Sequence, residues 1–135
     1  MKKLRIPFAE VKAFVLDMDG TVFLGDHLLP GAKQFTDYLK SSKIPYVFLT
    51  NNSSKHRGLY AQKLNQMGLE VEESQIFTSG EATIHFIQQN FPEIQQVALY
   101  GTPALEEEFE GYGFTLTTTH PQAVVLGFDT TLTYD

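Results

Sequence analysis

The segment Asp17-Met18-Asp19-Gly20-Thr21 directly follows a short run rich in valine and phenylalanine, residues 11–16. Such a run, ended by a polar turn, predicts a strand buried on both faces of a parallel sheet. Because side chains alternate along a strand, the two aspartates point to one side of it. Gly20 allows the backbone to turn sharply behind them. The segment therefore predicts a pair of carboxylates at the carboxyl end of a buried strand.

The rest of the chain repeats strand and helix patterns. Strands are predicted over residues 45–49 and 75–78. Helices are predicted over residues 32–42 and 81–89, and a further helix between them ends at Gly68. Strands that alternate with helices indicate right-handed βαβ units, so we predict an α/β fold with a doubly wound parallel sheet. The pattern restarts after residue 91, with strands at 96–100 and 123–127 around a helix at 104–109. We therefore expect one domain over residues 1–90 and the beginning of another over 91–135.

The composition narrows the classes of function. The 135 residues carry a net charge of −6, with an isoelectric point of about 5.1, and all ten basic residues lie at or before Lys63. This acidity argues against a general binder of nucleic acid or of an anionic membrane. The chain has no cysteine, which excludes disulfides, thiolate metal sites and a cysteine nucleophile. Without a convincing leader or a long apolar stretch, we expect a soluble, cytoplasmic protein.

The two carboxylates, Asp17 and Asp19, need a cation or a shared proton when they lie close together. A Mg²⁺ ion with oxygen ligands would satisfy them, leaving one carboxylate for nucleophilic attack and the other for proton transfer. A calcium loop is excluded because its fifth and twelfth positions would be Thr21 and Leu28, where carboxylate-type ligands are required. A plain Asx-type turn stays open as an alternative.

A second polar segment, Thr50-Asn51-Asn52, follows the next predicted strand. Its hydroxyl, amides and backbone N–H groups suit a phosphate oxygen at the start of a helix, and Thr50, Asn51 and Asn52 are the predicted substrate-binding residues. The same residue types also suit a helix N-cap, and both interpretations remain open. Open parallel sheets bind ligands at the carboxyl ends of their strands, so both polar segments are expected at one edge.

These motifs resemble the haloacid dehalogenase (HAD) superfamily of phosphatases, and within it the NagD-like, p-nitrophenyl phosphatase branch. The likeness extends to Leu29-Pro30-Gly31-Ala32, Thr78-Ser79-Gly80-Glu81 and residues 121–134. It implies a HAD-like Rossmannoid parallel sheet, present as a partial core, followed by the start of an α/β cap of the C2 type. The short spacing between Asp17 and Thr50 leaves no room for a cap there, which agrees with the later insertion point of this branch.

The resemblance also implies a mechanism. Asp17 would attack phosphorus to form an aspartyl-phosphate, and Asp19 would protonate the leaving oxygen and then activate water. Mg²⁺ would be held by the Asp17 side chain and the Asp19 backbone carbonyl, while Thr50 and Asn51 grip the phosphoryl oxygens. The expected substrate is a small phosphorylated metabolite, such as a sugar phosphate or a nucleotide.

The chain departs from the family in its later motifs. The family's third motif is a lysine after the cap, but no lysine lies beyond Lys63. Its fourth is a Gly-Asp pair with a further aspartate, which Gly127-Phe128-Asp129 and Asp135 only imitate, and Lys55 is a weak substitute for the lysine. We therefore expect the N-terminal half of a longer phosphatase, with Asp17 on an exposed edge strand and with low stability and little activity in isolation. A phosphoacceptor signalling module and a catalytically silent binding fragment stay open as alternatives.

Overall fold

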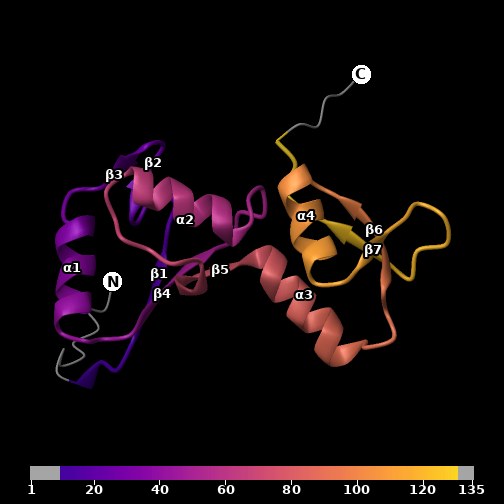
Figure 1. Cartoon of the computed structure of the whole chain (residues 1–135), viewed down its shortest axis with the longest axis horizontal. Helices are drawn as coiled ribbons and strands as arrows, with labels where there is room; N and C mark the ends of the chain where they lie inside the picture. Colours follow the sequence, from indigo (N-terminus) through magenta and orange to yellow (C-terminus); the bar gives the residue numbers. More distant parts are fainter. Residues whose placement is uncertain (1–9, 131–135) are drawn as a thin grey trace, which may run out of the picture.

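The computed structural model describes residues 10–130, which form two lobes that each contain a three-stranded sheet (Figure 1). In the first lobe, strands β1 (Phe14–Asp17), β4 (Tyr46–Thr50) and β5 (Ile76–Thr78) run parallel in the order β1-β4-β5. In the second, β6 (Gln96–Tyr100), β7 (Thr115–Leu116) and β8 (Ala123–Leu126) run parallel in the order β7-β6-β8. The predicted α/β class with parallel sheets is confirmed.

Helices connect these strands as the βαβ pattern predicts. They are α1 (Ala32–Ser41), α2 (Arg57–Gln66), α3 (Ser79–Asn90) and α4 (Pro103–Gly111), with a short 3₁₀ turn, η2 (Glu73–Gln75), before β5. Helix α3 begins two residues before the predicted start, because the Thr78 side chain accepts a hydrogen bond from the Glu81 N–H and caps the helix there. Each described helix is too short or too polar to cross a bilayer.

Three short strands were not predicted. Strands β2 (Phe23–Leu24) and β3 (His27–Leu28) form an antiparallel hairpin behind the aspartate pair, turning at Gly25, which has a φ of 59°. Strand β7 lies in the threonine-rich segment of residues 115–119, where no strand was predicted. Strands of two residues are too short to show an alternating pattern, so periodicity could not reveal them.

Strand β1 lies at the edge of the first sheet. Within the part of the chain that the structure describes, it pairs with β4 alone, in a register that sets Asp17 opposite Leu49. Val15 on this strand is 64% exposed. An edge strand with an exposed valine is a position at which another strand can pair. Within residues 10–130, the expected edge position of the Asp17 strand is confirmed.

Each lobe has an apolar core of its own. The core of the first lobe surrounds the β1 exit and includes Met18, Phe23, Phe48, Tyr60 and Leu64. The core of the second lobe includes Ile84, Ile87, Val97, Leu105 and Phe109, so α3 contributes its apolar face to the second lobe. Figure 1 shows α3 leading away from β5 to that lobe. Two separate cores with two separate sheets are typical of two folding units.

Candidate functional site

The two aspartates lie at the exit of β1, on either side of a buried residue. Asp17 and Asp19 are exposed, whereas Met18 between them is fully buried. The Met18 carbonyl accepts hydrogen bonds from the N–H groups of the next turn, and Gly20 adopts a φ of 80° to allow it. The Thr21 hydroxyl donates to Asp17 Oδ2 at 3.0 Å. The turn thus presents both carboxylates to solvent and fixes one oxygen of Asp17.

The second predicted segment forms a tight loop at the exit of β4, the neighbouring strand. Thr50 is 2% exposed, and its Oγ1 accepts from the Asn52 N–H at 3.1 Å. Asn52 Oδ1 in turn accepts from the Ser54 N–H at 3.0 Å. Asn51 is exposed, and its carbonyl accepts from the Ser79 hydroxyl at 3.1 Å, which ties the loop to the start of α3. Because β4 pairs in parallel with β1, this loop lies beside the carboxyl end of β1.

The N-cap of α2 is a different residue from those considered in the sequence. His56 Nδ1 accepts from the Gly58 N–H at 3.1 Å, and the helix begins at Arg57. The interpretation of residues 50–52 as the N-cap is therefore wrong. Their hydrogen bonds shape a loop before the helix instead.

Tyr60 is hydrogen-bonded to this loop and lies within electrostatic range of Asp19. Its hydroxyl donates to the Asn52 carbonyl at 3.2 Å. Burial raises the pKa of Tyr60 above its usual value, and the negative charge of nearby Asp19 raises it further, while hydrogen bonds with the Thr50 and Ser54 side chains act in the opposite direction. The groups expected in one site are thus near neighbours, and Tyr60 is a member that the sequence did not reveal.

The oxygen donors of this edge fit a magnesium ion. Mg²⁺ binds through one or two carboxylates and completes its shell with water and substrate phosphate oxygens. The Asp17 carboxylate and the Asp19 backbone carbonyl supply two oxygen ligands, and both residues are exposed. Within residues 10–130 no three His, Cys, Asp or Glu side chains are grouped to hold a metal. A Mg²⁺ ion held by this pair would complete its shell with further oxygen ligands, such as water, a substrate phosphate or another side chain.

Asp129 and Lys55, the possible replacements for the family's later motifs, lie in segments that contact the loop or Tyr60. The Phe128 N–H donates to Ser53 Oγ at 2.8 Å, so the segment of the second lobe that contains Asp129 contacts the loop. Asp135 lies outside the described residues. The Lys55 ammonium lies 5.9 Å from the centre of the Tyr60 ring.

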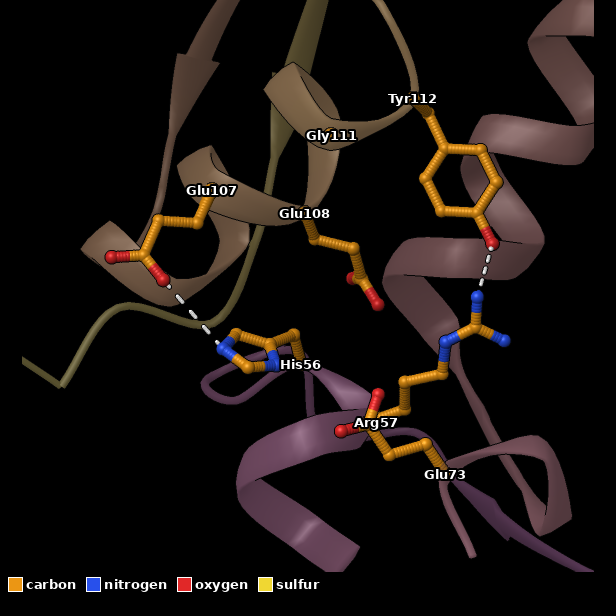
Figure 2. A pocket seen from close by; sticks show the side chains of 7 residues that line it. All are labelled: His56, Arg57, Glu73, Glu107, Glu108, Gly111 and Tyr112. Carbon is orange, nitrogen blue, oxygen red and sulfur yellow. Dashed lines mark hydrogen bonds and ion pairs between the residues drawn. The ribbon is translucent and has the colours of Figure 1, made fainter.

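A second polar cluster, not predicted from the sequence, joins the two lobes (Figure 2). Arg57 Nη1 lies 3.0 Å from Glu81 Oε1, and the Tyr112 hydroxyl donates to the same oxygen at 2.7 Å. Glu108 on α4 accepts from the Thr78 hydroxyl at 3.0 Å. This cluster borders a cavity of about 510 Å³ lined by His56, Arg57, Glu73, Glu107, Glu108, Gly111 and Tyr112. The residues of this cluster come from segments that are distant in the sequence, so no local sequence pattern predicts it.

Glu108 should make the stability of the chain depend on pH. Burial raises its pKa above 4.5, and neighbouring Glu81 adds to this effect. A raised folded-state pKa adds stability that is fully present below the unfolded pKa and is lost as pH rises through the folded pKa. Glu108→Gln removes this loss, so we expect it to stabilise the chain by about 1 kcal/mol at neutral pH, and by much less near pH 4.5. Melting curves at both pH values measure the difference.

The control for this variant is Glu106→Gln, on the exposed side of the same helix. It should leave the melting temperature nearly unchanged at both pH values. An equal effect of the two substitutions at neutral pH would show that the burial of Glu108 is not the cause.

Comparison with known proteins identifies the family of the chain. The family model of haloacid dehalogenase-like hydrolases matches residues 14–115, which is more than half of the chain. The chain belongs to the haloacid dehalogenase-like hydrolases. Among curated HAD relatives, the acid sugar phosphatase of Staphylococcus aureus is 33% identical over 127 residues, which cover 93% of this chain and 49% of that protein. The chain thus spans about half the length of the curated relatives it matches.

Solved HAD structures resemble the chain as well. The crystal structure of 4-nitrophenylphosphatase from Thermotoga maritima is 44% identical, with a TM-score of 0.85 over 92% of this chain and 47% of that one. Glycerol phosphate phosphatase from Mycobacterium tuberculosis, in complex with magnesium, is 28% identical, with a TM-score of 0.81 over 93% of this chain and 39% of that one. The predicted NagD-like, p-nitrophenyl phosphatase branch is confirmed.

Proposed function

We propose that this chain carries the nucleophile and the phosphate-binding loop of a Mg²⁺-dependent phosphatase that acts on phosphate monoesters of small metabolites. The observation that carries the proposal is the meeting of the Asp17 and Asp19 turn with the loop of residues 50–54 at one sheet edge. The names of the relatives favour sugar phosphates and glycerol phosphate as substrates.

In the proposed reaction, Asp17 attacks the phosphorus atom and the bond to the leaving oxygen breaks. Asp17 Oδ1 makes the attack, because Oδ2 is engaged by the Thr21 hydroxyl. Asp19 gives its proton to the leaving oxygen, which leaves an aspartyl-phosphate on Asp17. Asp19 then takes a proton from water as the water oxygen attacks phosphorus, and inorganic phosphate departs from the regenerated carboxylate.

The loop beside this pair binds the group that is transferred. The Thr50 hydroxyl and the Asn51 amide donate to phosphoryl oxygens, and Asn52 shapes the loop through its two hydrogen bonds. Bound magnesium, held by the Asp17 carboxylate and the Asp19 backbone carbonyl, would supply positive charge to the phosphoryl oxygens. Positioning and electrostatics provide most of the acceleration in phosphoryl transfer. Both depend on how the aspartate turn and the loop are held at the carboxyl ends of β1 and β4.

The two lobes have separate roles in this proposal. Residues 1–90 belong to the catalytic core, and residues 91–135 begin a cap that faces the leaving group. The separate sheets and separate apolar cores support two units, and α3, which the proposal assigns to the catalytic core, packs its apolar face in the core of the second lobe. Contacts such as the hydrogen bond from Thr102 Oγ1 to the Ser54 carbonyl, at 2.9 Å, link the second lobe to the phosphate loop.

Hydrolysis of p-nitrophenyl phosphate tests the proposal. The protein expressed from its whole gene should release p-nitrophenol in the presence of Mg²⁺, and a chelator should lower the rate about a hundredfold or more until Mg²⁺ is restored. The 135-residue chain should be nearly inactive and should melt at a lower temperature. The proposal fails if the whole-gene protein hydrolyses neither p-nitrophenyl phosphate nor sugar phosphates, and its metal requirement fails if the chelator has no effect.

A further inference from the structure

We propose that Tyr60 is a positioning residue of this site, whose hydroxyl holds the phosphate loop of residues 50–54 in place beside Asp17 and Asp19. The inference rests on the proposed function and adds to it a residue outside the aspartate turn and outside the loop itself. Tyr60 lies near the start of α2, after the loop has ended.

The position of the phenol is the first argument. Tyr60 is 2% exposed and packs in the core of the first lobe with Met18, Phe23 and Phe48. A phenylalanine would fill this apolar position equally well, and a buried hydroxyl costs free energy unless it has a partner. The hydroxyl has one, the Asn52 carbonyl at 3.2 Å. The hydroxyl of Tyr60 therefore binds the loop, while its ring packs in the core.

The place of Asn52 in the loop is the second argument. Its N–H donates to Thr50 Oγ1, and its side chain accepts from the Ser54 N–H, so one residue organises both halves of the loop. A hydrogen bond to its carbonyl fixes the third polar group of the same residue. Because Thr50 and Asn51 would donate to the phosphoryl oxygens, any loosening at Asn52 moves the donors away from their acceptors.

The register of the sheet is the third argument. Asp17 at the end of β1 lies opposite Leu49 on β4, so the loop that follows β4 starts beside the aspartate turn. A hydrogen bond that anchors this loop therefore also fixes its position relative to the two aspartates.

The test is Tyr60→Phe in the protein expressed from its whole gene, with Tyr46→Phe as the matched control. This control removes a tyrosine hydroxyl at the opposite end of β4, where the Tyr46 ring packs edge-on against Phe48. We expect Tyr60→Phe to lower kcat/KM for p-nitrophenyl phosphate about tenfold and to raise the inhibition constant of inorganic phosphate by a similar factor, because the loop loses its hydrogen bonds with the phenol. Tyr46→Phe should match the wild type in both.

Hydrogen exchange provides a measurement that does not depend on turnover. Amides of residues 50–54 should exchange faster in Tyr60→Phe than in the wild type or in Tyr46→Phe, at a temperature where all three are folded. The inference is overturned if Tyr60→Phe lowers only the melting temperature and leaves kcat/KM, phosphate inhibition and loop exchange at wild-type values. An inactive wild-type protein would instead refute the proposed function, and this inference with it.

Discussion

Asp17→Asn in the whole-gene protein is expected to lower kcat for p-nitrophenyl phosphate by roughly 10⁴-fold or more, because an amide cannot replace the attacking carboxylate. The change is nearly isosteric, and the remaining amide oxygen can still accept from the Thr21 hydroxyl, which donates to Asp17 at 3.0 Å. Asp17 is also exposed, so its removal leaves the core intact. The melting temperature should therefore stay close to that of the wild type.

The matched control is Asp26→Asn, in the turn of the β2-β3 hairpin. Asp26 is exposed and makes a peripheral contact with Lys63, 3.6 Å away. Exposed ion pairs contribute little, so kcat should change less than twofold. Steady-state rates of the three proteins at saturating substrate give the comparison. Retention of more than a tenth of wild-type kcat by Asp17→Asn would exclude Asp17 as the nucleophile.

Asp19→Asn should produce the second largest effect, about 10³-fold in kcat, and its size should depend on the leaving group. p-Nitrophenolate departs without a proton, so the first step survives while the attack of water lacks its base. We expect a burst of p-nitrophenol close to one equivalent per enzyme, followed by slow turnover. A sugar phosphate needs a proton on its leaving oxygen, so with that substrate the variant should show no burst.

Rapid-mixing measurements of p-nitrophenol release from the one substrate, and of free sugar release from the other, distinguish these cases. Equal losses for p-nitrophenyl phosphate and for a sugar phosphate, without a burst for either, would contradict the role of Asp19 as both acid and base. The position of Asp19 supports the dual role, since it is exposed to solvent and lies near the Tyr60 phenol that anchors the phosphate loop.

Much of the first lobe could be predicted because its signals are local. The apolar run before Asp17 and the polar segment after Leu49 mark two strand exits, and parallel strands bring such exits together. The two polar segments therefore meet as expected. The same reasoning left two roles open for residues 50–52, and the structure excludes one of them, because His56 rather than these residues caps α2.

Other features depend on contacts between segments distant in sequence, which no local pattern contains. The pairing of Arg57 with Glu81 and that of Thr78 with Glu108 appear only when α2, α3 and α4 pack together. Tyr60 shows the same limit, since helical spacing places its ring in the core but does not reveal the partner of its hydroxyl.

Trapping the phosphorylated enzyme tests the central claim most directly. The Asp19→Asn variant of the whole-gene protein is mixed with p-nitrophenyl phosphate and Mg²⁺ and quenched in acid, and its peptides are mapped by mass spectrometry. Our mechanism predicts one phosphate, carried by Asp17, and none when Asp17→Asn is added to the variant. A phosphate on another residue, or a burst of p-nitrophenol with no phosphorylated peptide, would contradict it.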